Sequence, residues 1–306
     1  MRFSPLVFFL SYFIFHRGAL AAATFPFVIP MEDASKTVVD VSALNPAPLA
    51  EQNRLAIRDG HFYDQTGRRV KFLATLIGAG ACFPPPEEAP IIAARLRKFG
   101  FNMVRLHHMD PHWANPNIFY LEGNSYGKPT TVLDPRSLDR LDHLVAELKR
   151  SGIYVDINLH VTRGYSAADG FPEPENLNSE GKVVGYFEPG MIERQKLYAR
   201  QLLTHKNPYT GLAYSHDPAV AIIEITNEDS LLGSADSIGA LPEHYRAIIQ
   251  KGWNAFLKGK YGTTKALLAS WNQEAKPYGA ELLRNRRFEE GTLGWSREQQ
   301  GSTSYA

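Results

Sequence analysis

The residues of this chain best suited to chemistry stand at or just beyond the ends of short apolar runs. Residues 220–225 are almost entirely apolar, and the polar pair Asn227 and Glu228 follows almost at once. A carboxyl group in such a place can donate a proton to a leaving group, and the amide beside it can orient a substrate hydroxyl. The other polar side chains in comparable positions are Arg105, His107 and His160.

The elements that must position these side chains alternate between strand and helix. Four runs rich in β-branched and apolar residues are typical of buried parallel strands, namely residues 72–77, 102–107, 153–160 and 220–225. Helices are expected over residues 91–99, 135–151, 191–203, 243–258 and 264–272, and a β-hairpin over residues 57–71. Asp134 and Pro135 mark one helix start as N-cap and first helical residue. This alternation predicts an α/β fold with a parallel sheet.

The connections indicate which α/β fold this is. Those after the second and third predicted strands are long and aromatic, whereas the returns from helix to strand are as tight as Ser151-Gly152. This asymmetry is typical of a (β/α)8 TIM barrel, whose functional residues lie at the carboxyl ends of its strands. Only four barrel strands are predicted, so we expect the barrel to be incomplete in this chain, with a short β segment at the C-terminus.

The order of these motifs resembles glycoside hydrolase family 5, the cellulase and mannanase family of the retaining barrel clan. The motifs are Gly100-Phe101-Asn102-Met103-Val104-Arg105, Asn158-Leu159-His160 and Ile225-Thr226-Asn227-Glu228. Two later segments fit as well: Lys260–Leu267 with Trp271 and Asn272 is similar to β-galactosidase-type members. Phe288, Glu289, Gly291, Gly294 and Trp295 resemble the opening strand of a carbohydrate-binding module.

The resemblance implies roles for particular residues. Glu228 would be the general acid/base, with Asn227 binding the sugar, and Arg105 and His160 supporting the nucleophile and the substrate. Retaining hydrolysis uses a second carboxylate about 5 Å from the first. In the family this nucleophile is a glutamate after the seventh strand, and no seventh strand is predicted here. The chain is therefore expected to be a truncated form.

Several residues allow more than one interpretation. An ion pair of Arg105 with Glu224 or Asp156 is as good an expectation as a role in the site. His160 is either a site residue or a buried structural histidine. His107, His108, Asp110 and His112 have the side-chain types of a zinc site. Adjacent strand histidines should point to opposite faces, however, so no metal or other cofactor is expected. Trp113 is the aromatic residue most expected to contact a sugar, and Cys82 is expected to be buried and inert.

The two ends of the chain suggest export and a second module. Arg2, the apolar stretch Leu6–Phe15 and the small residues Ala19 and Ala21 resemble a cleaved signal peptide, with a membrane anchor as the weaker alternative. The predicted domains are a signal peptide (1–23), a loosely ordered segment (24–54), the barrel portion (55–280) and the start of a carbohydrate-binding module (281–306).

Composition narrows the classes of partner. A formal net charge of +1 gives no electrostatic reason to expect nucleic acid or an anionic membrane as a partner. The expected protein is a secreted or periplasmic glycoside hydrolase that acts on a β-linked poly- or oligosaccharide. The alternatives are a non-catalytic carbohydrate-binding or scaffold protein on a degenerate barrel and a metal-dependent hydrolase.

Overall fold

The computed structural model describes residues 36–177 and 181–272, together with residues 30, 285, 289–291 and 293–294. Two sheets are formed by the strands β1 Ala56–Arg58, β2 His61–Tyr63, β3 Arg69–Val70, β4 Ala74–Gly78, β5 Met103–His107, β6 Tyr154–His160 and β7 Val220–Thr226. The α-helices are α2 Ala89–Lys98, α3 Pro135–Arg150, α4 Gly181–Val184, α5 Pro189–Thr204, α6 Ala235–Ile238, α7 Glu243–Tyr261 and α8 Thr264–Trp271. Single 3-10 turns occur at Ser42–Leu44, Glu51–Asn53, Ala79–Cys82, Ala167–Asp169, Pro174–Asn176 and Tyr214–His216.

The small antiparallel sheet corrects the predicted hairpin over residues 57–71. It has three strands, β1-β2-β3, in place of two. Asp59 and Gly60 both have positive φ, 48° and 72°, and turn the chain between β1 and β2. An Asp-Gly pair between short strands favours this kind of tight turn, so the signal was present in the sequence.

The larger sheet has the order β4-β5-β6-β7, and every neighbouring pair is parallel. All four predicted barrel strands are therefore present, in chain order and within two residues of their predicted bounds. This confirms the α/β fold with a parallel sheet. Among the described residues the sheet has these four strands, with β4 and β7 at its edges.

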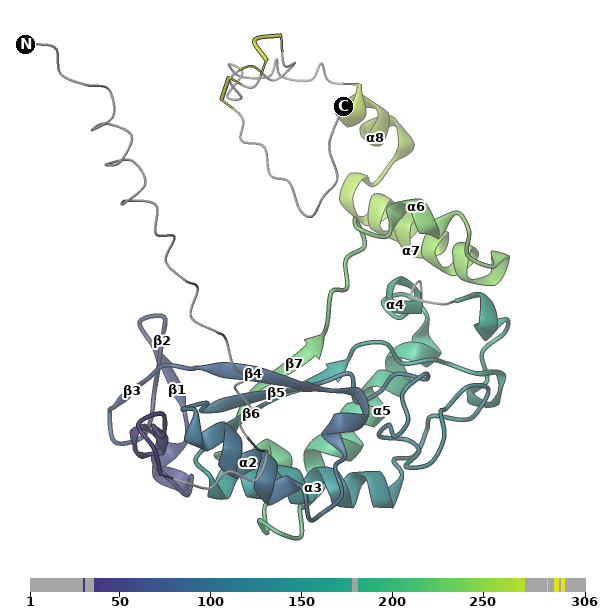
Figure 1. Ribbon diagram of the computed structural model, residues 1–306. Coiled ribbons are helices and arrows are strands. Elements are labelled where there is room, and N and C mark those ends of the chain that lie inside the picture. The colour runs from purple at the N-terminus through teal and green to yellow at the C-terminus, as the bar shows by residue number, and fades with distance from the viewer. Residues whose placement is uncertain are drawn as a thin grey trace, which may run out of the picture. The chain divides into compact units, whose positions relative to one another are not determined.

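Helices α2, α3 and α5 cover one face of the parallel sheet (Figure 1). The core lies between them, where Val104 and Leu106 of β5 and Val155 and Ile157 of β6 are each at most 1% exposed. Because side chains alternate along a strand, the intervening residues of β5 and β6 face the other side of the sheet. That second face carries polar groups, and it forms the candidate site.

Helix α3 begins as its sequence predicts. The Asp134 carboxylate accepts hydrogen bonds from the backbone amides of Arg136 (2.8 Å) and Ser137 (3.3 Å), and Pro135 is the first helical residue. These bonds satisfy amides that have no partner inside the helix. The helix buries Leu141, Leu144 and Leu148 against the sheet.

Strand β7 was predicted to be buried on both faces, but part of it is exposed. Ile223 and Ile225 are 38% and 74% exposed, although Ile223 is level with the buried Ile157 of β6 and so faces the helix-covered side, at the edge of the sheet. Ile222 and Glu224 lie on the other side, level with Asp156 and Asn158 of β6. The run of apolar residues thus identifies the strand correctly but not its burial.

Gly152, between α3 and β6, cannot be replaced without strain. Its φ is +76°, and a Cβ atom there would lie 2.1 Å from the carbonyl oxygen of Pro46. We expect Gly152→Ala to lower the free energy of unfolding by roughly 3 kcal/mol or more, since both backbone strain and a clash are introduced. Gly211 is the matched control, because it has φ +70° and a Cβ atom added there would have no neighbour within 4 Å.

Urea unfolding of both variants measures the difference. Gly211→Ala is expected to lose only about 1–2 kcal/mol, the strain of a left-handed conformation alone. Equal losses in the two variants would show that the contact with Pro46 contributes nothing.

The chain divides into two compact units, residues 1–249 and 250–306, and the division falls within α7. In the second unit, the Thr263 hydroxyl caps α8 by accepting a hydrogen bond from the Ala266 amide (3.1 Å), and Trp253 stacks on Phe256. Within the described ranges, no helix has the length and apolar character needed to cross a membrane. The predicted signal peptide lies outside the described residues, as does most of the predicted carbohydrate-binding module.

Candidate active site at the carboxyl ends of the parallel strands

A chain of hydrogen bonds joins three strands across the polar face of the sheet. The Nδ2 group of Asn158 on β6 donates to Glu224 Oε2 on β7 (2.8 Å), and Arg105 Nε on β5 donates to Glu224 Oε1 (2.7 Å). Arg105 Nη2 also bonds Glu224 and donates to Asn227 Oδ1 (2.9 Å). The side chain of Asn227 is thereby fixed from β5, two strands away in the sheet.

His107 belongs to the same network. Its Nδ1 atom lies 2.8 Å from Asn158 Oδ1. The Asn158 amide nitrogen donates to Glu224, so the amide oxygen of Asn158 faces His107. An oxygen of this kind accepts a hydrogen bond, and His107 Nδ1 must therefore carry the hydrogen. Arg105, His107 and Asn227, which the sequence singles out separately, are therefore parts of one assembly. The ion pair of Arg105 with Glu224 is present, and it coexists with the contact to Asn227.

The charges of this network perturb one another. The hydrogen bonds from Arg105 hold the pKa of Glu224 below the usual value, and the same bonds raise the pKa of Arg105. Asp156, also on this face, is 6% exposed, and its Oδ1 atom has no hydrogen-bond partner. Burial, and next the neighbouring Glu224 carboxylate, raise the pKa of Asp156 to about 7. Asp156 therefore holds a proton at mildly acidic pH, where Glu224 is ionised.

This raised pKa gives a testable pH dependence of stability. A folded-state pKa above the unfolded value means that Asp156 favours folding at acidic pH, and that this contribution is lost as pH rises through about 7. An asparagine at this position would mimic the protonated acid at every pH. We expect Asp156→Asn to raise stability at about pH 8 by at least about 1 kcal/mol, or roughly 2–4 °C in Tm, and by much less at about pH 4.

The measurement is thermal unfolding of both proteins across that pH range. Arg105 and Glu224 are the other charged groups that act on Asp156. A Tm difference that does not change with pH would contradict a titrating Asp156.

Glu228 stands at the end of this assembly with its side chain free. The amide of Asn227 donates to the His160 carbonyl (3.0 Å), which extends the pairing of β6 and β7 by one residue. Glu228 then turns out of the sheet with φ +48°, is exposed, and makes no hydrogen bond or ion pair with the described residues. Non-glycine residues with positive φ concentrate at functional sites, where the strain is held by surrounding structure. His108, which follows β5 directly, shares this conformation with φ +52°.

Two residues outside the predicted site hold the turn that carries Glu228. Lys182 Nζ in α4 donates to the Asn227 carbonyl (2.9 Å), and the Tyr186 hydroxyl donates to the Asp229 carbonyl (3.1 Å). Both contacts are to backbone atoms, and they join segments about forty residues apart in the sequence. No spacing or motif marks such contacts.

His160 is buried beside a second carboxylate, Asp110. His160 Nδ1 lies 3.6 Å from Asp110 Oδ2, beyond hydrogen-bonding distance, and neither ring nitrogen of His160 has a hydrogen-bond partner. Asp110 is fully buried and accepts hydrogen bonds from the amides of Val161 (3.0 Å) and Thr162 (3.2 Å). Burial would raise the pKa of Asp110, but His160 and these amides outweigh it and lower the pKa.

The adjacent histidines at the end of β5, His107 and His108, correct one expectation. His107 and His108 do not point to opposite faces: their rings meet edge to face with centroids 4.0 Å apart. The left-handed turn at His108 takes this residue out of the strand and so removes the alternation. Trp113 lies beside them, 46% exposed, with its ring 5.7 Å from that of His108. In the described part of the chain, no group of three His, Cys, Asp or Glu side chains is arranged to hold a metal ion.

Cys82 is buried, and its thiol donates to the carbonyl of Ile77 (3.3 Å). Burial raises the pKa of this thiol to about 12, so no thiolate forms near neutral pH. The prediction of a buried, inert cysteine is confirmed.

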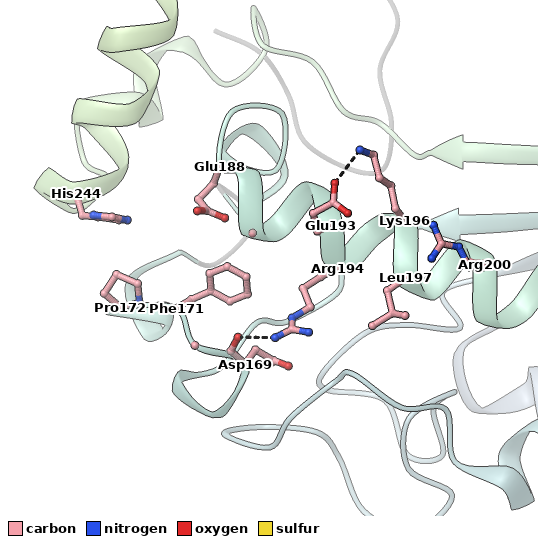
Figure 2. A pocket seen from close by; sticks show the side chains of 12 residues that line it. Asp169, Phe171, Pro172, Glu188, Glu193, Arg194, Lys196, Leu197, Arg200 and His244 are labelled. Carbon is pink, nitrogen blue, oxygen red and sulfur yellow. Dashed lines mark hydrogen bonds and ion pairs between the residues drawn. The ribbon is translucent and has the colours of Figure 1, made fainter.

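A cavity of about 680 Å³ lies away from the network of Arg105, Asn158 and Glu224, and none of the predicted site residues lines it. Figure 2 shows Arg194 of α5 bonded to the backbone of Asp169, and Lys196 paired with Glu193. Asp169 is buried and accepts hydrogen bonds from Thr130 and Ser166. The strand-end network remains the candidate active site, because it places an unpaired carboxylate beside an oriented amide.

Comparisons with known proteins find distant relatives over part of the chain. No protein-family model matches it. Mannan endo-1,4-beta-mannosidase 2 of Arabidopsis thaliana is 28% identical over 166 residues, which are 50% of this chain and 38% of that protein. Mannan endo-1,4-beta-mannosidase 2 of Oryza sativa subsp. japonica is 26% identical over 176 residues, 51% of this chain and 39% of that protein. The chain thus spans less than half the length of these relatives.

Two solved structures also align in part. The endo-1,4-beta-mannanase from Rhizomucor miehei has a TM-score of 0.44 and 18% identity, covering 57% of this chain and 48% of that one. A glycoside hydrolase family 5 protein from Bacteroides vulgatus has a TM-score of 0.41 and 14% identity, covering 67% and 39%. Along about half of its length, this chain is distantly related to plant mannan endo-1,4-beta-mannosidases.

Proposed function

We propose that this chain supplies the general acid/base of a retaining glycoside hydrolase of family 5 type that acts on β-1,4-linked mannan. The observation that carries the proposal is Glu228, which is exposed and unpaired at the end of β7, directly after an asparagine held by Arg105. The names of the plant relatives support mannan as the substrate.

The chemistry assigned to each group follows from its surroundings. Glu228 would protonate the glycosidic oxygen as the bond breaks, and would then take a proton from the water that completes hydrolysis. Asn227, whose Oδ1 accepts from Arg105, keeps its Nδ2 group to donate to a sugar hydroxyl. Trp113 offers an exposed ring beside His108 on which a sugar could stack.

The nucleophile is left unassigned in this proposal. Two other carboxylates lie on the polar face of the described strands. Glu224 is occupied by Arg105 and Asn158, and Asp156 retains a proton up to about pH 7. Neither is suited to attack a sugar carbon.

This arrangement also favours a second candidate function, a non-catalytic carbohydrate-binding protein. It would use the same oriented Asn227 and exposed Trp113, without a nucleophile. For either function we propose export through the N-terminal segment, residues 1–23, and no cofactor.

Incubation of the purified chain with β-1,4-mannan and, separately, with β-1,4-glucan tests the proposal. Release of reducing ends from mannan, with the β-anomer formed first in NMR spectra, supports the retaining hydrolase. Binding of mannan without any release supports the carbohydrate-binding protein. If the chain neither cleaves nor binds mannan, both proposals are wrong.

A further inference from the structure

A second cavity, of about 360 Å³, lies between the long loops that follow β5 and β6. The first loop contributes His112, Ser125 and Tyr126 to the lining, and the second contributes residues 163–167, 174, 175 and 177. An antiparallel bridge between Pro111 and Arg163 joins the two loops. This loop cavity shares no lining residue with the network of Arg105, Asn158, Glu224 and Asn227.

The walls of the loop cavity contain buried polar atoms without partners. Ser125 is 2% exposed, and its Oγ atom has no hydrogen bond. The Nδ1 atom of His112 also lacks a hydrogen bond, and the Tyr165 hydroxyl has only the neighbouring Gln195 side chain beside it. A buried polar group without a partner costs about 1–3 kcal/mol, so these groups favour a polar ligand that can hydrogen-bond them.

The loop cavity also has an aromatic surface. Tyr126 is 56% exposed, and its ring packs edge-on against the ring of His112, with centroids 4.5 Å apart. Gly164 permits this arrangement, since a Cβ atom there would lie 2.5 Å from the His112 side chain. An exposed, rigid ring beside hydroxyl and imidazole groups suits a molecule with one apolar face and many hydroxyls.

The charged groups of the cavity favour a neutral ligand over an anion. The guanidinium group of Arg163 is buried, and each of its three nitrogens makes a hydrogen bond. Nε donates to Thr130 Oγ1 (3.1 Å), Nη1 donates to the Arg194 carbonyl (2.9 Å), and Nη2 donates to the Thr130 carbonyl. Glu175, also in the lining, would repel an anion. We propose that the loop cavity is an accessory subsite that binds a neutral sugar residue of a β-linked oligosaccharide, independently of the chemistry at Glu228.

Calorimetric titration with mannohexaose and with cellohexaose tests this subsite. Both are titrated into the wild-type chain and into Glu228→Gln, which excludes turnover. Tyr126→Ala is expected to weaken binding roughly fivefold to tenfold, by loss of the stacking surface. Ser125→Ala is expected to weaken it about threefold to tenfold while leaving Tm unchanged or raised, because the hydroxyl has no partner in the free protein.

Tyr209→Ala is the matched control. Tyr209 is 43% exposed and packs edge-on against His143 as Tyr126 does against His112, but it belongs to the segment before β7, at the amino ends of the strands. Its removal should leave sugar binding unchanged. The proposal is overturned if neither oligosaccharide binds, or if Tyr126→Ala and Ser125→Ala bind as tightly as Tyr209→Ala. Loss of hydrolysis in Glu228→Gln with sugar affinity retained separates this subsite from the proposed catalytic function.

Discussion

Replacement of Glu228 by glutamine is expected to reduce mannan hydrolysis by about 10²–10⁴-fold, the usual contribution of a general acid/base. The fold should be unaffected, because the Glu228 carboxylate is exposed and makes no hydrogen bond or ion pair with the described residues, although its charge acts on Arg105. A surface substitution of this kind changes stability by about 0.5 kcal/mol or less. Release of reducing ends measures the first effect, and thermal unfolding the second.

The leaving group of the substrate provides the sharper test of this role. A 2,4-dinitrophenyl β-mannoside needs no proton on its departing oxygen, so its first cleavage step should survive in Glu228→Gln. Glu51→Gln is the matched control, because Glu51 is an exposed carboxylate paired only with Arg54. Wild-type turnover of mannan by Glu228→Gln, or equal loss with both kinds of substrate, would rule out a proton donor at this position.

Replacement of Arg105 by methionine is expected to lower the free energy of unfolding by about 2 kcal/mol, or roughly 4–8 °C in Tm. The side chains of Arg105 and Glu224 are only 26% and 28% exposed, so the Glu224 carboxylate would lose its cation in a place that water reaches poorly. Asn227 would lose the donor that fixes its side chain. Urea unfolding at neutral pH measures the loss.

A double-mutant cycle separates the pair from its surroundings. When both partners are replaced by apolar residues of similar size, as in Arg105→Met with Glu224→Leu, most of the lost stability should return. Mannan binding or cleavage should remain impaired in the double variant, since Asn227 is still without its partner. Additive destabilisation in the double variant would contradict a coupled ion pair.

The elements of the first unit were well predicted from the sequence, because their signals are local. The run at residues 153–160 is apolar enough to be recognised as β6, and Asp134-Pro135 defines the start of α3 by capping alone. Prediction failed where burial depends on neighbours that no local pattern reveals. Ile223 and Ile225 were expected in the core, yet they are exposed on an edge strand. His108 was expected to continue the strand, yet it turns out of it.

The sequence by itself determined which residue types stand at the strand ends, and in what order. Strand period and helix capping act over a few residues, so His160, Asn227 and Glu228 could be placed at the carboxyl ends of parallel strands, and Arg105 within one, without a structure. Only the tertiary structure decided how they are connected. The bonds of Arg105 to Glu224 and of Lys182 to Asn227 join residues far apart in the sequence, and the pairing of strands brings them together. These contacts hold Asn227, the residue before Glu228, and no hydrogen bond or ion pair with the described residues holds the Glu228 carboxylate itself.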